Sequence, residues 1–125
     1  NMINLIANKG YYFTPHLLKN VEAEKIFLNL SEHTWSYLNN SMWRVTNAKD
    51  GTGKIANVPN GVVRGKTGTA QNPHGDDHSW FSGYIVADNL KAMSIVVMIE
   101  NGGRGSGIAS EIAKNAFTYF ANGND

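Results

Sequence analysis

The sequence predicts an α+β fold in which antiparallel strands pack against a C-terminal helix. Apolar residues recur with helical spacing in two segments, and strand-like runs lie between them. The last two runs are separated by Asp88-Asn89-Leu90, a short turn typical of an antiparallel hairpin. Elements in this order form layers of helix and sheet around one core. The helical segments span 31–47 and 108–120, and the strand-like runs span 61–70, 79–87 and 91–100.

The N-terminal part of the chain predicts two short elements. Residues 1–8 have the pattern of a helix end, with Gly10 as the stop signal. The aromatic run 11–14 favours a strand, and Pro15 restricts it to a brief or edge strand. A helix end and one short strand are therefore expected before the first long helix.

The longest expected element is a helix from Ser31 to Asn47. Ser31 is a suitable N-cap, and Glu32 complements the helix dipole in the first turn. Asp50-Gly51-Thr52-Gly53 ends the helix, and residues 55–60 are expected to form a loop. The apolar stripe of the helix consists of Trp35, Leu38, Met42 and Val45.

The C-terminal helix follows a glycine-rich loop at residues 101–107. Two apolar rows with four-residue steps predict that one broad stripe of this helix is buried. Trp35, Met42, Phe117 and Phe120 are expected in the core. The first row is Ile108, Ile112, Ala116 and Phe120, and Ala109, Ala113 and Phe117 widen it.

Composition limits the possible classes of function. The 125 residues are enough for one domain, and 42% of them are hydrophobic, which is a globular composition. A net charge of +1 provides neither a basic surface for nucleic acid nor a polybasic membrane patch. The absence of cysteine excludes disulfides and cysteine-bound zinc. Because no signal peptide is visible and the chain opens inside a helical pattern, we expect a piece of a longer protein.

Gly65-Lys66-Thr67 has the composition of the end of a phosphate-binding loop. That motif needs a glycine where this sequence has Asn60, and it must open a helix, which residues 68–73 do not. The glycine-rich loop at 101–107 precedes a helix, but no acidic residue follows at the distance that a ribose partner requires. It is expected to be a tight turn between a strand and a helix.

Lys66-Thr67-Gly68-Thr69 has a different physical logic if it lies on a strand. Alternate side chains share a face, so Lys66 and Gly68 are expected on one face and Thr67 and Thr69 on the other. Gly68 leaves room for a ligand backbone, and an edge strand offers unpaired N–H and C=O groups to a peptide-like substrate. Lys66 adds a cation for a carboxylate. The strand therefore predicts one wall of a site for a carboxylated, peptide-like acyl donor.

The sequence around this motif resembles the penicillin-recognising serine enzymes. Lys66-Thr67-Gly68 matches the third motif of the penicillin-binding proteins and serine β-lactamases. GKTGTAQ at 65–71, followed by HSWFSGY at 78–84, is similar to class B penicillin-binding proteins of the elongation type. The stretches 4–19, 42–56 and 94–117 resemble other parts of the same transpeptidases, so the resemblance covers nearly the whole chain.

The resemblance implies roles for four residues of the active-site wall. Lys66 and Thr67 would hold the hydrogen-bond network and the substrate carboxylate. Thr69 would contribute its backbone N–H to an oxyanion hole and its hydroxyl to the ligand, and Gly68 completes the wall. The neighbouring strand would serve mostly for packing, through Trp80, Phe81, Gly83 and Tyr84.

The nucleophile of such enzymes is absent from this sequence. It lies in Ser-x-x-Lys, and a second motif, Ser-x-Asn, completes the site, but no serine here has either spacing. Residues 46–49 have the first spacing with a threonine at a helix end, and Tyr37-Leu38-Asn39 mimics a variant of the second motif but is interpreted as helix surface. We therefore expect residues 1–125 to be the C-terminal portion of a transpeptidase domain, inactive by itself.

The resemblance implies a parent protein that is a peptidoglycan D,D-transpeptidase with an acyl-serine mechanism and no cofactor. Its partners would be peptidoglycan stem peptides, β-lactams and the cell-wall elongation machinery, and not nucleic acid. It would act at the periplasmic face of the bacterial inner membrane. Two alternatives stay open: a fragment of a serine β-lactamase or D,D-carboxypeptidase, and a non-catalytic binding module of the same fold. Strands cut from a larger sheet would expose an edge and an apolar face, so self-association is expected.

His74-Gly75-Asp76-Asp77-His78 places two imidazoles and two carboxylates close together in the sequence. Such ligands can hold zinc, and with Ser79 they suggest a Ser-His-Asp triad. Triads converge in space and seldom from adjacent residues, and the resemblance places a polar loop without a metal here. No metal site is therefore expected, and Arg104 in the glycine-rich loop is expected to face solvent.

Overall fold

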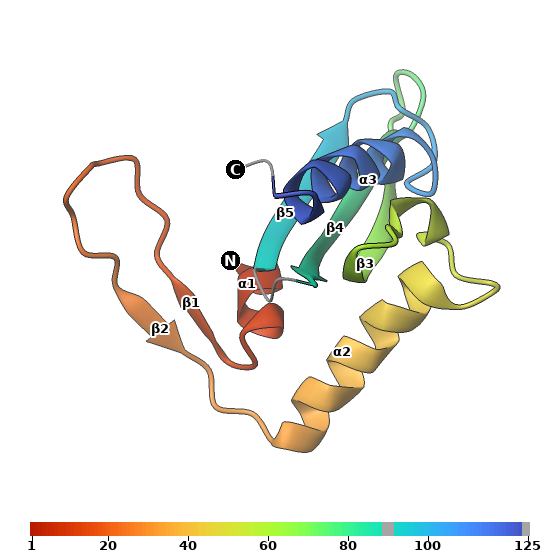
Figure 1. Cartoon of the computed structure of the whole chain (residues 1–125). Coiled ribbons are helices and arrows are strands. Elements are labelled where there is room, and N and C mark those ends of the chain that lie inside the picture. The colour runs from red at the N-terminus through yellow and green to blue at the C-terminus, as the bar shows by residue number, and fades with distance from the viewer. Residues whose placement is uncertain (89–91, 124–125) are drawn as a thin grey trace.

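The computed structural model describes residues 1–88 and 92–123, and it confirms the predicted α+β arrangement (Figure 1). Within this part of the chain, β3, β4 and β5 form an antiparallel sheet in that order, and β1 and β2 form a separate antiparallel ribbon. The elements are α1 (Met2–Ala7), β1 (Tyr11–Phe13), β2 (Lys25–Phe27), α2 (Glu32–Asn47), a short 3-10 turn (Lys54–Ala56), β3 (Gly61–Ala70), β4 (His78–Ala87), β5 (Ala92–Ile99) and α3 (Ile108–Ala121).

The sheet is covered by helices on both faces. On one face α3 packs on the strands, as Figure 1 shows, and the fully buried rings of Phe81 and Phe117 meet edge to face there with centroids 6.3 Å apart. On the other face α1 packs against β4 and α2 packs mainly against β3, and Ile6, Trp35 and Tyr84 belong to one buried cluster there. The core therefore consists of two layers separated by the sheet, and substitutions on alternate strand positions affect different helices.

The C-terminal end of α2 is tied directly to β3. Ser31 caps the start of the helix, because its hydroxyl accepts the N–H of Thr34 at 3.1 Å. At the other end, the buried hydroxyl of Thr46 donates to the carbonyl of Val63 at 2.7 Å, and the amide of Asn47 donates to the same carbonyl at 2.9 Å. These bonds fix the position of β3 relative to the helix that precedes it.

Two expectations about the local structure were wrong. The chain has a second short strand, β2, which the residue pattern does not predict. Lys25 stabilises it, because its Nζ lies 3.8 Å from the centroid of the Tyr11 ring. The expected loop at 55–60 begins with a 3-10 turn. The turn at Asp88-Asn89-Leu90 and the start of the last strand at Lys91 lie outside the described residues, but the antiparallel register of β4 and β5 is confirmed.

The buried stripe of α3 differs from the expected one. Ala109, Ala113 and Phe117 are fully buried, whereas Ile108 and Ile112 are 40% and 37% exposed. Alanine at the first two positions lets the helix approach the sheet closely, and this turns the isoleucines toward the rim. Phe120 packs at the edge of the core instead of inside it.

The outer strand β5 presents exposed apolar side chains, which predicts self-association of this chain. Val96 is 60% exposed and Met98 is 42% exposed, and in the described part of the chain β5 has a hydrogen-bonded neighbour on one side only. Sedimentation velocity should therefore show a sedimentation coefficient that rises with concentration, and Val96→Lys should reduce this rise. A monodisperse monomer at every concentration would contradict the prediction.

Among the described residues, no helix combines the length and apolarity that crossing a bilayer requires.

Candidate functional site

The predicted strand position of Lys66-Thr67-Gly68-Thr69 is confirmed. The motif lies in the C-terminal half of β3, which pairs with β4 on one side and has a free edge on the other within the described residues. The carbonyls of Val63 and Thr67 accept side-chain bonds, the latter from Lys66 Nζ at 2.7 Å, which indicates that these residues turn their backbone polar groups toward the free edge. Alternation by two residues places the backbone N–H of Thr69 on the same edge.

The predicted division of the motif between the two faces of the sheet is also confirmed. Lys66 lies on the face of α1 and α2, where it borders a cavity of about 390 Å³ lined mainly by apolar residues, among them Ile6 and Met42. Thr69 lies on the face of α3, and its hydroxyl oxygen accepts the N–H of Gly105 at 3.2 Å. Lys66 is exposed, so its ammonium is accessible to a ligand at the strand edge.

Thr52 also contacts the motif, and it is a site residue that the motif spacing does not predict. Its Oγ1 lies 2.9 Å from Oγ1 of Thr67, so the loop after α2 is hydrogen-bonded to the strand. The loop itself is held close to the helix end, since a Cβ on Gly51 would lie 2.4 Å from the carbonyl oxygen of Val45. The signal in the sequence is a threonine between two glycines, which supplies a hydroxyl on a tightly packed turn.

The glycine-rich loop at 101–107 packs against β3 and β4 beside the motif. A Cβ on Gly105 would lie 2.0 Å from the carbonyl oxygen of Gly68, so the two backbones are in direct contact. Two fully buried serines anchor the loop: Ser79 donates to the carbonyl of Arg104 at 2.9 Å, and Ser110 donates to the carbonyl of Gly105 at 2.8 Å. The loop thus positions the N–H of Gly105, which donates to the hydroxyl oxygen of Thr69. The side chain of Arg104 is exposed, as expected.

The loop at residues 74–78 is used for structure. Asp77 accepts the N–H of Asn72 at 3.3 Å, and Nδ1 of His78 accepts the N–H of Asn101 at 3.0 Å. The backbone carbonyl of Asp77 also accepts the N–H of Gly103 at 2.7 Å. These bonds connect the loop before β4 to the glycine-rich loop, and among the described residues no three metal-ligating side chains converge. Ser79 next to this loop is buried and bonded to backbone, so it is not poised as a nucleophile.

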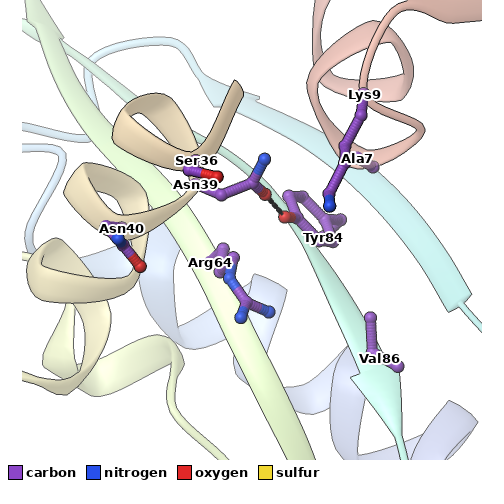
Figure 2. Close-up of a pocket in the computed structure, with 8 residues that line it drawn as sticks. All are labelled: Ala7, Lys9, Ser36, Asn39, Asn40, Arg64, Tyr84 and Val86. Atoms are coloured by element: carbon purple, nitrogen blue, oxygen red, sulfur yellow. Dashed lines mark hydrogen bonds between the residues drawn. The ribbon is translucent and has the colours of Figure 1, made fainter. Parts of the chain in front are cut away.

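A second pocket lies on the face of α1 and α2, farther toward the N-terminal end of β3 (Figure 2).

The prediction that Tyr37-Leu38-Asn39 is helix surface was wrong for Asn39. Tyr37 is exposed on α2, as predicted, but the Asn39 carboxamide oxygen accepts the hydroxyl of Tyr84, and its Nδ2 donates to the carbonyl of Ile6 at 3.3 Å. Asn39 is therefore half-buried and links α1, α2 and β4 through these bonds.

Burial of Tyr84 predicts a loss of stability at alkaline pH. Desolvation raises the pKa of its phenol above the ordinary value of 10.0, while the nearby Arg64 cation acts in the opposite direction with a smaller effect. Above pH 10.0 the unfolded chain releases this proton and the folded chain keeps it, so the free energy of unfolding falls until the pH passes the folded-state pKa. Tyr84→Phe should remove this slope.

Urea unfolding about one pH unit below and above the ordinary tyrosine pKa measures the effect. The matched control is Tyr37→Phe, which removes the hydroxyl of an exposed tyrosine on α2. Equal alkaline losses in the wild-type chain and in Tyr84→Phe would count against the stated role of burial.

Comparison with known proteins gives concordant matches over almost the whole chain. The profile of the family described as "Penicillin binding protein transpeptidase domain" matches residues 1–118. The peptidoglycan D,D-transpeptidase MrdA of Haemophilus influenzae is 33% identical over 94% of this chain, and that of Acinetobacter baumannii is 30% identical over 93%. The chain spans about a fifth of the length of these relatives, 22% and 20%.

Solved structures agree with the sequence relatives. PBP2 of Pseudomonas aeruginosa, determined in complex with WCK 5153, superimposes with a TM-score of 0.77 at 28% identity, covering 95% of this chain and 28% of that one. The D,D-transpeptidase domain of a peptidoglycan glycosyltransferase from Eggerthella lenta superimposes with a TM-score of 0.70 at 28% identity, covering 95% and 30%.

Proposed function

Since the chain belongs to the penicillin-binding protein transpeptidase domain family, we propose that it is part of a peptidoglycan D,D-transpeptidase and supplies one wall of the active site. The free edge of β3, with Lys66, Thr67 and Thr69 arranged along it, is the observation that carries this proposal. A free edge pairs with an extended peptide through backbone hydrogen bonds, and a cation beside it favours a substrate that carries a carboxylate.

Each residue of the wall has a proposed role. Lys66 and Thr67 hold the substrate carboxylate, and Thr52 keeps the Thr67 hydroxyl in place through their 2.9 Å contact. The backbone N–H of Thr69 stabilises the oxyanion that forms when the peptide carbonyl is attacked. Gly68 leaves room for a ligand over the strand, where a Cβ would already lie 3.2 Å from Cβ of Trp80.

The attacking group is proposed to come from outside these 125 residues. No serine of the chain has lysine three residues later, and catalysis of acyl transfer needs a nucleophile beside a base. In the proposed reaction a serine oxygen bonds to the stem-peptide carbonyl carbon, the C–N bond to the leaving amine breaks, and the serine proton passes to that amine. The acceptor amine of a second stem peptide then bonds to the same carbon, the ester bond to the serine breaks, and a proton of the acceptor returns to the serine oxygen. A β-lactam acylates the same serine. We further propose the periplasmic face of the inner membrane as the location, and the cell-wall elongation machinery as partner.

Intact mass after incubation with benzylpenicillin tests the proposal. The measurement compares this chain with a longer protein that contains it together with an upstream Ser-x-x-Lys segment. A gain of one penicillin mass by the longer protein alone supports an active-site wall that lacks its nucleophile here. No gain by either protein would favour a non-catalytic binding module, and a gain by the short chain would place the nucleophile within it.

A further inference from the structure

The second pocket, between α1, α2, β3 and β4, is polar and basic. Its volume is about 310 Å³, at the lower end of the range for small-molecule sites. Two cationic side chains, Lys9 and Arg64, line it together with the hydroxyl of Ser36 and the carboxamide of Asn40, and no carboxylate of the described residues is part of the lining. Figure 2 shows Arg64 between α2 and Tyr84. The pocket thus presents several hydrogen-bond donors and excess positive charge.

Arg64 is incompletely satisfied in the described part of the chain. Its Nε is buried and has no hydrogen-bond partner there, and the side chain as a whole is partly buried. Its guanidinium carbon lies 5.9 Å from the centroid of the Tyr84 ring, a cation–π contact that does not satisfy the N–H of Nε. A partly buried guanidinium with an unpaired Nε donor is stabilised by an anion that accepts two parallel hydrogen bonds from the guanidinium edge.

Lys9 provides the second cation of the pocket. It occupies a left-handed backbone conformation with φ 52° after α1, a conformation that lysine adopts rarely. The nearest carboxylate is that of Glu32, 3.8 Å from the Lys9 Nζ, and both side chains are largely exposed. An exposed pair of this kind is weak, so an anion in the pocket can compete for the lysine.

We propose that this pocket binds a small oxyanion, a carboxylate or a phosphate group, with Arg64 as its bidentate anchor. Lys9 contributes long-range attraction, and Ser36 and Asn40 contribute neutral donors. The site is separate from the Lys66 wall, because the two cavities share no lining residue although Arg64 and Lys66 are on the same face of β3. Oxyanion binding in this pocket therefore does not depend on the proposed transpeptidase function.

Titration of the ¹⁵N-labelled chain by NMR tests the proposal, with sodium acetate and sodium phosphate as separate probes at constant ionic strength. The expected result is saturable shifts of the amides of residues 36, 40 and 64 with at least one probe, and the probe with tighter binding identifies the oxyanion class. Arg64→Gln should weaken that binding roughly tenfold or more, because charged hydrogen bonds are lost. Lys114→Gln on α3, far from the pocket, is the charge-matched control and should bind as the wild type does.

Arg64→Lys keeps the positive charge but removes the planar fork, so it should bind more weakly than the wild type and more tightly than Arg64→Gln. This variant keeps the test decisive if Arg64→Gln fails to fold. Shifts that grow linearly without saturation with both probes, or equal affinities in the wild type and in the available Arg64 variant, would overturn the proposal.

Discussion

Replacement of Gly105 by alanine is expected to reduce the free energy of unfolding by about 3 kcal/mol. The added methyl carbon would lie 2.0 Å from the carbonyl oxygen of Gly68 and 2.6 Å from that of Trp80. Both obstacles are backbone atoms inside a sheet, so neither can turn away as a flexible side chain would. The glycine-rich loop must therefore lift from β3, which also breaks the hydrogen bond from Gly105 to Thr69.

Urea unfolding of the variant measures this loss. Ser106→Ala is the control in the same loop, because position 106 already carries a Cβ and the substitution adds no atom. We expect the control to change stability by less than about 1 kcal/mol. Equal effects of the two substitutions would show that the contact between the loop and β3 is not as close as the structure has it.

Replacement of Lys66 by alanine is expected to slow penicillin acylation of the longer transpeptidase by about 100-fold or more. The substitution removes the cation at the strand edge, together with the hydrogen bond from its Nζ to the Thr67 carbonyl. We attribute the expected loss to ligand binding and orientation, because Lys66 is exposed and supports no part of the core. The fold should therefore remain intact.

The second-order rate constant of acylation by a fluorescent penicillin measures the effect, and Lys114→Ala controls for the loss of one positive charge. Lys66→Arg should recover part of the rate, since a cation returns but its length and shape differ. An unchanged rate in Lys66→Ala with normal folding would remove Lys66 from the active-site wall.

The main sheet could be predicted from the sequence because its signals are local. The run at 61–70 was expected as a strand and coincides with β3, and alternation alone assigned Lys66 and Thr69 to opposite faces. The N-cap of α2 at Ser31 and the stripe through Trp35 and Met42 are likewise local patterns with a direct structural consequence.

Other features could not be predicted, because they depend on contacts between distant segments. Asn39 looks like helix surface in the sequence, and its partial burial and its hydrogen bond depend on Tyr84, a residue 45 positions away. Thr52 and Thr67 are 15 positions apart and are joined by a hydrogen bond. No local pattern predicts that the segment between them brings the two hydroxyls together. The exposure of Ile112 depends on how closely the alanines of α3 approach the sheet, which the apolar spacing does not reveal.

The two faces of β3 explain why this strand can organise a site. One face is fixed to the C-terminal helix layer through Thr69 and Gly105, and the other carries Lys66 and Arg64 toward α1 and α2. The strand is thus held from both sides while its outer edge stays open within the described residues. Rigid support around an open edge is what a preorganised binding wall requires.

Amide hydrogen exchange at the edge of β3, measured in the longer protein before and after acylation by benzylpenicillin, shows whether this edge contacts the ligand. Exchange at Thr69 should slow by roughly tenfold or more, because its N–H becomes hydrogen-bonded to the ligand. Exchange along β5, the other outer strand, should change much less. Unchanged exchange at Thr69, or equal slowing on both strands, would contradict the claim that the edge of β3 is a wall of the penicillin-reactive site.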